Sequence, residues 1–172
     1  MGDSLITIVA IFLAAILMFV FPLATISEMN DNEATAMVQS YTTEFVNNIR
    51  SKGKVTKEDY DAFVQKLYAT GNSYDVDFEL QIADTNPGKK TATQQIGDTT
   101  YYSVFTSQVE SELNSNKHSY LLKEGDYVIV YVKNTNTTIS QMIKSVLYSI
   151  TGNQSYVIMA QDSGGVVATG YY

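Results

Sequence analysis

The residues of this sequence that could do chemistry are few, and their spacing limits what they could do. Asp75, Asp77 and Glu79 carry the carboxylate oxygens that calcium prefers as ligands. Residues two apart on a strand share one face, however, so this alternation predicts the water-facing side of a strand. Glu110 and Glu112 stand two apart in a predicted helix and would not face each other, which makes them a poor acid–base pair. These carboxylates therefore indicate neither a metal site nor a catalytic pair.

The composition excludes several further classes of function. The 172 residues include no cysteine and one histidine, so thiolate ligation of zinc or of an iron–sulfur cluster is impossible. That histidine, His118, lies in a polar stretch and is expected to be exposed. The phosphate-binding loop, the dinucleotide fingerprint and the serine nucleophile elbow are all missing from the sequence. The net charge of −7 argues against binding to nucleic acid. We therefore expect a protein that is not an enzyme, has no cofactor and does not bind nucleic acid.

The hydrophobic residues are concentrated in residues 5–23, which carry no charge and are called the apolar run below. As a helix the apolar run would be about 28 Å long, close to the hydrocarbon thickness of a bilayer. The first basic residue is Arg50, so the run lacks the positive segment that precedes the apolar core of a signal peptide. The chain is then either a simple N-anchored membrane protein or the product of cleavage of a basic leader. We favour cleavage just before Met1.

The helix is predicted to continue well beyond the apolar run. Arg50 and Lys52 would lie in its last turn, and Gly53 would form a left-handed cap. Pro22 removes one helix hydrogen bond, so a kink or a local loosening is expected there. The second half has apolar residues at steps of three and four, which is the period of an amphipathic helix: Ile26, Met29, Ala34, Met37, Val38, Tyr41, Phe45, Val46 and Ile49.

The remaining sequence predicts a small head of helices and strands. In order, we expect a helix over residues 56–71, a strand over 74–82, a polar loop over 84–98, a helix over 99–114, a strand over 127–132 that is buried on both faces, a helix from Thr138 to Gly152, and strands over 156–160 and 166–172 joined by a hairpin at 162–165. The predicted fold class is α+β, with a mainly antiparallel sheet of about four strands. Two parts follow: an N-terminal transmembrane or assembly helix over 1–53 and an extracellular globular head over 54–172. So small a head cannot cover the first half of the helix, which lipid or other subunits must therefore enclose.

This pattern resembles that of type IV pilin-like proteins. The resemblance is carried by the apolar run, by the single carboxylate of Asp3 before it, by Pro22 and by the amphipathic rod over residues 26–49. It implies a structural subunit of an extracellular pilus-like filament, or fimbrium, which could serve adhesion at the cell surface. The subunit would be inserted in the cytoplasmic membrane before assembly, and its partners would be identical subunits, a prepilin peptidase and the assembly machinery. Leu5 stands where the family usually has glutamate. In broad architecture the head is similar to the small pilin-like proteins of tight-adherence systems or Gram-positive secretion loci, and the absence of cysteine favours a Gram-positive or archaeal source.

The resemblance also implies an assembly site at the start of the helix. A carboxylate among apolar residues is costly unless it is paired. Asp3 could therefore accept hydrogen bonds from the α-amino group of a neighbouring subunit and set the axial register. A first-turn acid favoured by the helix dipole is the alternative interpretation of Asp3. The residues expected in the assembly site are Met1, Asp3, Leu5, Ile8, Phe12, Ile16, Phe19 and Pro22.

A second class of function stays open at this point. A membrane-anchored extracytoplasmic binding protein, or a pseudopilin-like secretion accessory protein, would need the same apolar run. Asn136 and Asn153 begin N-glycosylation sequons, which would matter in an archaeal source.

Overall fold

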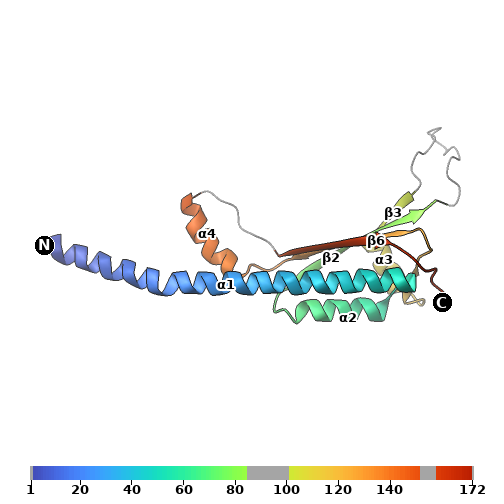
Figure 1. Ribbon diagram of the computed structural model, residues 1–172, viewed down its shortest axis with the longest axis horizontal. Coiled ribbons are helices and arrows are strands. Elements are labelled where there is room, and N and C mark those ends of the chain that lie inside the picture. The colour runs from blue at the N-terminus through green and yellow to red at the C-terminus, as the bar shows by residue number, and fades with distance from the viewer. Residues whose placement is uncertain (1, 85–100, 152–157, 172) are drawn as a thin grey trace, which may run out of the picture.

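The computed structural model describes residues 2–84, 101–151 and 158–171. A long N-terminal helix runs the length of the molecule, and an α+β head surrounds its C-terminal half (Figure 1), so the predicted fold class is confirmed. The chain N-terminus lies at the far end of the rod from the head (Figure 1). The elements are α1 (Gly2–Lys52), β1 (Lys54–Thr56), α2 (Lys57–Tyr68), β2 (Tyr74–Ala83), β3 (Tyr101–Phe105), α3 (Thr106–Leu113), β4 (Ser119–Leu121), β5 (Tyr127–Asn134), α4 (Ile139–Thr151) and β6 (Met159–Gly165).

Helix α1 ends as the sequence predicts. Arg50 and Lys52 lie in the last turn, where positive charge complements the helix dipole. Gly53 follows with φ +65°, and its N–H donates to the Ile49 carbonyl at 2.8 Å. The helix continues without a break through Pro22, so the proline does not end it. The rod curves gently over its N-terminal part (Figure 1).

The main sheet has the strand order β3-β2-β5-β6, and every neighbouring pair is antiparallel. A separate two-stranded sheet joins β1 and β4. Strand β5 is central, as expected, but it is buried on one face only, because its side chains alternate in burial along the strand. Tyr131, for example, keeps 39% of its surface exposed. The prediction of burial on both faces was wrong because helices cover a single face of this sheet.

Helices α1 and α2 cover the same face of the main sheet. The ring of Phe78 on β2 lies 6.0 Å from that of Phe45 on α1 and 5.7 Å from that of Tyr60 on α2. Phe45 also stacks on Phe63 of α2 with ring centroids 4.3 Å apart. The second half of α1 is thus part of the hydrophobic core of the head. The other face of β2, which carries Asp75, Asp77 and Glu79, is the water-facing side, as expected.

The hairpin predicted at residues 162–165 does not exist. These residues belong to β6, which pairs with β5 along its whole length, and residues 166–171 form no strand. Gly164 has another role, since a Cβ atom there would lie 2.5 Å from Nε of Arg50. The glycine lets α1 pack closely on β6, where Arg50 Nε donates to the Gly165 carbonyl at 2.8 Å.

The helix predicted over residues 99–114 is correct only in its second half. Residues 101–105 form β3, which pairs with the end of β2, and α3 begins at Thr106. Aromatic residues such as Tyr101, Tyr102 and Phe105 favour strands when a partner strand is available. The Thr106 hydroxyl then accepts a hydrogen bond from the Phe78 N–H at 2.9 Å, which marks the change from strand to helix. Residues 99 and 100 lie outside the described part of the chain.

The helix starts in the head follow local capping signals. The Thr56 hydroxyl accepts from the Asp59 N–H at 3.1 Å at the start of α2. At the start of α4, the Thr138 hydroxyl accepts from the Gln141 N–H at 3.2 Å, and the Gln141 side chain accepts from the Thr138 N–H at 2.8 Å. Both helices were predicted. Most of the predicted polar loop, Gly152 and residues 156–157 of the strand predicted over 156–160 lie outside the described residues. The end of that predicted strand falls in β6.

Candidate functional site

The most unusual surface of the molecule is the N-terminal half of α1. The predicted assembly residues on it are exposed: Leu5 by 66%, Ile8 by 63%, Phe12 by 71%, Ile16 by 46% and Phe19 by 70%. Pro22 is exposed as well. The structure brings these residues together only as neighbours along one helix, at a distance from the head (Figure 1).

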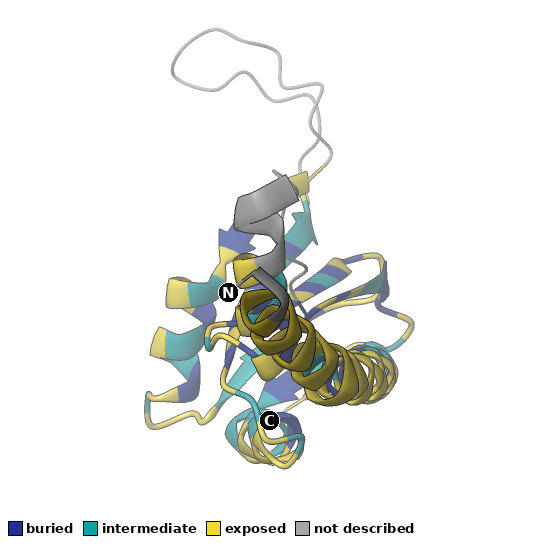
Figure 2. Cartoon of the chain, turned by 90° about the vertical axis from the view of Figure 1, so that its left-hand side faces the viewer, coloured by how far each residue is buried: buried dark blue, intermediate teal, exposed yellow. Residues whose placement is uncertain are grey.

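The exposure extends around the whole circumference of the helix. In the view from the N-terminal end, α1 is exposed on every visible side (Figure 2). The predicted assembly residues are therefore not distinguished by exposure from the other large apolar residues of the same segment: Ile6, Val9, Ile11, Leu13, Leu17, Met18, Phe21 and Leu23. Burial of each such side chain is worth about 1.5–3 kcal/mol, so a surface of this size favours a covering of lipid or protein strongly.

Helix α1 is long and apolar enough to cross a membrane. It is the helix among the described residues that meets this criterion of length and composition. A membrane anchor and a signal sequence share these properties.

The head begins to cover α1 later than the sequence predicted. Ile26 and Met29 were expected in the stripe that packs on the head, but they are 55% and 65% exposed. Burial is sustained from Ala34 onward, because the main sheet does not extend to the earlier turns. Ile26 and Met29 therefore extend the exposed apolar surface, and neither was assigned to the assembly site from the sequence. The signal for them was present, since both continue the apolar run along the same helix.

Two predicted site residues cannot be placed in full. Met1 lies outside the described residues. The backbone of Asp3 is in the first turn of α1, but its side chain is outside the described part of the structure. The role of Asp3 in setting an axial register stays a prediction.

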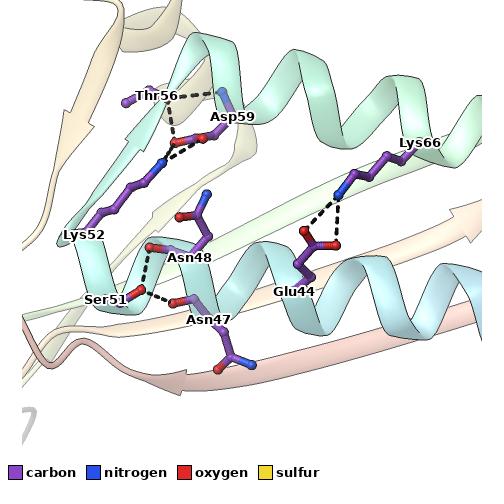
Figure 3. Close-up of polar contacts among 8 residues, drawn as sticks. All are labelled: Glu44, Asn47, Asn48, Ser51, Lys52, Thr56, Asp59 and Lys66. Carbon is purple, nitrogen blue, oxygen red and sulfur yellow. Dashed lines mark hydrogen bonds and ion pairs between the residues drawn. The ribbon is translucent and has the colours of Figure 1, made fainter.

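Polar contacts fix the rod to the head at its C-terminal end (Figure 3). Lys52 Nζ of α1 lies 2.9 Å from the Asp59 carboxylate, which also accepts from the Thr56 hydroxyl at 2.8 Å. Burial acts to raise the pKa of Asp59, but these hydrogen bonds and the charge of Lys52 outweigh it and lower that pKa. A second ion pair joins Lys66 of α2 to Glu44 of α1 at 2.9 Å. The second half of α1 and the head therefore form one packed unit.

Helix α4 contacts α1 at the boundary between its bare and covered halves. Lys144 Nζ lies 2.8 Å from Oε1 of Glu28, and the Thr138 hydroxyl donates to Oδ2 of Asp31 at 2.8 Å. Figure 1 shows α4 rising from α1 on the side of the apolar run. The sequence predicted this helix but not its position.

No group of three His, Asp or Glu side chains that could hold a metal ion occurs among the described residues. His118 is exposed, as expected. Burial, together with the charge of Glu110 at a hydroxyl–carboxylate distance of 3.4 Å, raises the pKa of Tyr60 to about 12, and this partly buried tyrosine packs against the core.

Asn136, which begins a glycosylation sequon, forms hydrogen bonds within the head through its side chain. The Asn136 side-chain nitrogen donates to Asn72 at 2.9 Å, and its oxygen accepts from the Ser73 N–H at 2.9 Å. Attachment of a glycan to that nitrogen would disturb the contact with Asn72. Asn153 lies outside the described residues.

Comparison of the chain with protein-family models, curated proteins and solved structures gave no match. The geometry is therefore the basis for assigning a function. It offers one continuous helix whose first half exposes apolar side chains on all sides and whose second half contributes to the core of a folded head.

Proposed function

We propose that this protein is a pilin-like structural subunit of an extracellular filament. Before assembly its apolar run lies in the cytoplasmic membrane. In the filament the apolar runs of neighbouring subunits pack against one another, and the heads form the outer surface. A prepilin-type peptidase and an assembly machinery are the further partners that this route requires. The observation that carries the proposal is a bare apolar helix that continues, without a linker, into the core of the head.

The continuity of α1 favours a filament subunit over a simple anchor with a binding head. An anchor needs only to hold its head near the membrane, and a flexible linker suffices for that. A filament repeats the same relation between rod and head in every subunit, which requires the two to be joined without a flexible linker. The continuity of α1 and the packing of Phe45 on the head support this.

The residues after the apolar run also support a filament. Membrane helices are commonly fixed at the interface by Trp, Tyr, Lys or Arg. None of these residue types occurs between Leu23 and Tyr41, where Glu28, Asp31 and Glu33 stand instead. This side of the run thus lacks the usual signals of a permanent anchor, which suits a subunit that leaves the lipid.

Replacement of Phe19 by alanine is expected to have a small effect on insertion into lipid and a large effect on assembly. In lipid, the change removes about 0.5 kcal/mol of insertion free energy from a run that remains strongly apolar. In a packed bundle of helices, loss of a large buried side chain leaves a cavity and costs about 3–5 kcal/mol. We expect Phe19→Ala to reduce the yield of sheared filaments sharply while the level of the subunit in the membrane stays normal.

Val167→Ala is the matched control, because this residue is 64% exposed on the head and should leave both quantities unchanged. Wild-type filament yield from Phe19→Ala, together with the same result for Phe12→Ala, would contradict packing through the apolar run. Lack of filaments from the wild-type chain under conditions that express its assembly machinery would contradict the proposal as a whole.

A further inference from the structure

Strand β3 forms one edge of the main sheet and is bound to β2 on its inner side only. Bonds between antiparallel strands use the backbone of alternate residues. The N–H of Phe78 on β2 points toward β3, because it donates to the Thr106 hydroxyl at 2.9 Å. In the observed register, the backbones of Val104 and Tyr102 therefore face β2 as well.

The residues between them turn their backbone outward, away from β2. Phe105 agrees with this alternation, because its N–H donates to Oε1 of Gln108 at 3.1 Å. The N–H and C=O groups of Tyr101 and Ser103 have no hydrogen-bond partner within the described part of the chain. Both residues are exposed. An extended strand is the ligand that can satisfy such a row of backbone groups.

The opposite edge of the sheet, strand β6, is covered. Helix α1 runs along β6, whereas β3 lies farther from the rod (Figure 1). The Gln161 carbonyl of β6 accepts from Gln39 at 3.1 Å, and the Gly165 carbonyl accepts from Arg50 at 2.8 Å. Proteins commonly cover a sheet edge in this way, which prevents pairing with other chains. For the residues that the structure describes, β3 is thus the open edge of the main sheet.

The sequence of β3 contains none of the features that usually block pairing. Its residues are Tyr-Tyr-Ser-Val-Phe, without charge, proline or glycine. Tyr101 is 44% exposed and Tyr102 is 57% exposed. Aromatic residues favour strands and stabilise cross-strand pairs. An incoming strand would therefore bind the open backbone groups and cover aromatic rings at the same time.

The open groups of β3 match those of a second β3 in one register. Antiparallel pairing about a two-fold axis at Tyr102 places Tyr101 of each copy opposite Ser103 of the other. Every open N–H and C=O group of these residues then gains a partner, and like charges do not meet. The neighbouring register, centred on Ser103, would need the N–H of Phe105, which Gln108 already binds.

We propose that β3 is a docking edge for β3 of a second copy of this chain, in antiparallel register centred on Tyr102. A two-fold contact closes on itself, and the covered edge at β6 prevents further growth of the sheet. The contact is much smaller than the interface of a stable dimer, so single heads stay apart in dilute solution.

On filaments, the same weak contact would be repeated along the surface and would gain strength from its number. Neighbours in one filament are related by a screw operation, which makes head-to-tail contacts. A two-fold contact between heads therefore joins two separate filaments. This consequence rests on the proposed function, whereas the pairing of β3 does not.

Disulfide trapping tests the register, because the natural chain has no cysteine. Full-length Tyr102→Cys is placed in lipid nanodiscs at one chain per disc, concentrated and mildly oxidised, and dimers are measured on non-reducing gels. At the two-fold axis the Cα atoms of residue 102 would lie about 4.5 Å apart, within reach of a disulfide. We expect Tyr102→Cys to form dimers readily.

Tyr101→Cys and Ser103→Cys are the matched controls. Two copies of residue 101, or two of residue 103, would be diagonal neighbours about 7–8 Å apart, at or beyond the limit for a disulfide. Each variant alone should therefore give severalfold less dimer than Tyr102→Cys. A mixture of the two should form dimers, because residues 101 and 103 lie opposite each other. The mixture supplies the same test if Tyr102→Cys does not fold.

Ser103→Lys tests the consequence for filaments. A charge on an edge strand blocks pairing, so sheared filaments should separate from bundles into single filaments while their yield stays normal. Gln161→Lys makes the same change on the covered edge and should leave both bundles and yield unchanged.

The possible results separate this inference from the proposed function. Equal dimer yields at residues 101, 102 and 103, or no dimers from either Tyr102→Cys or the mixture, would overturn the pairing and leave the filament proposal intact. Dimers specific to this register, together with a lack of filaments from the wild-type chain, would support the pairing and reject the proposed function. Bundles that persist in Ser103→Lys would overturn the role of β3 between filaments.

Discussion

Two glycines with left-handed backbones show how differently the same residue type is used in this fold. Gly53 has φ +65° and Gly71 has φ +84°. A side chain at Gly53 would collide with the backbone of Ala168 and Gly170, whereas a side chain at Gly71 would meet nothing within 4 Å. The first glycine therefore permits both a turn and a close approach of the C-terminal segment, and the second permits a turn only.

The pair yields a prediction for stability. Gly71→Ala should lower the free energy of unfolding by about 1–2 kcal/mol, the usual penalty for a left-handed non-glycine residue. Gly53→Ala carries the same penalty and in addition displaces the C-terminal segment, so its loss should be clearly larger. Thermal melting of both variants in detergent, followed by circular dichroism, measures the difference. Equal melting temperatures would show that the contact of Gly53 with residues 168–170 does not contribute.

Tyr60 gives a prediction for alkaline pH. Burial and the nearby Glu110 raise the pKa of Tyr60 to about 12 from an ordinary value of 10.0. Because the folded-state pKa is raised, the contribution of Tyr60 to the free energy of unfolding is complete below pH 10. It is lost as the pH rises from 10 toward 12, where the tyrosine ionises in the unfolded chain first. Tyr60→Phe should therefore show a smaller fall in melting temperature across this range than the wild type does.

The control for this experiment is Tyr68→Phe, at a tyrosine that is 52% exposed. Its melting temperature should follow the wild-type curve between pH 10 and 12. An unchanged alkaline slope in Tyr60→Phe would mean that ionisation of Tyr60 is not coupled to unfolding.

At the scale of elements, local signals predicted helices better than strands. The caps at Thr56 and Thr138 and the glycine after α1 are decided by neighbouring residues, so the starts of α2 and α4 and the end of α1 could be read from the sequence. Strand β3 could not be read from the sequence, because Tyr101, Phe105 and Val109 have helix-like spacing. Tyr101 and Phe105 lie in a strand only because this segment pairs with the distant β2.

The hairpin predicted at the glycines of β6 was wrong for a related reason. A Gly-Gly pair after Asp and Ser is typical of a hairpin turn, and nothing local indicates that Arg50 will lie against one of these glycines. The three-residue strands β1 and β4 are too short to show any alternation.

The division of α1 into a bare half and a covered half predicts how the chain responds to truncation. A chain that begins at Glu28 loses the apolar run and Ile26 but keeps the pair with Lys144 and the core residues from Ala34 onward. We expect it to be soluble, folded and monomeric by ultracentrifugation and circular dichroism.

A chain that begins at Tyr41 is the informative comparison. It also lacks Ala34 and Val38, which are 6% and 0% exposed in the core. Loss of these buried side chains should lower the melting temperature markedly or prevent folding. Aggregation of the chain that begins at Glu28, or equal stability of the two chains, would contradict this boundary between the bare and covered halves of α1.

At the scale of the whole molecule, the sequence could identify the apolar run but not what covers it. Its residues are apolar on all sides, so no periodicity distinguishes Leu5 or Phe12 from their neighbours as contact residues. The position of α4 beside the run could not be predicted without the contacts of Lys144 with Glu28 and of Thr138 with Asp31. The monomer leaves the apolar run bare, and the proposed function assigns its covering to other subunits.

Electron cryomicroscopy of filaments sheared from cells that make this chain tests the central claim most directly. We expect filaments with a core of parallel helices, in which residues 5–23 of each subunit are enclosed by the same residues of its neighbours, and with the heads outside. Filaments that contain the chain but leave residues 5–23 out of the subunit contacts would contradict the claim. So would a chain that stays in the membrane fraction, with no filaments, while its assembly machinery is present.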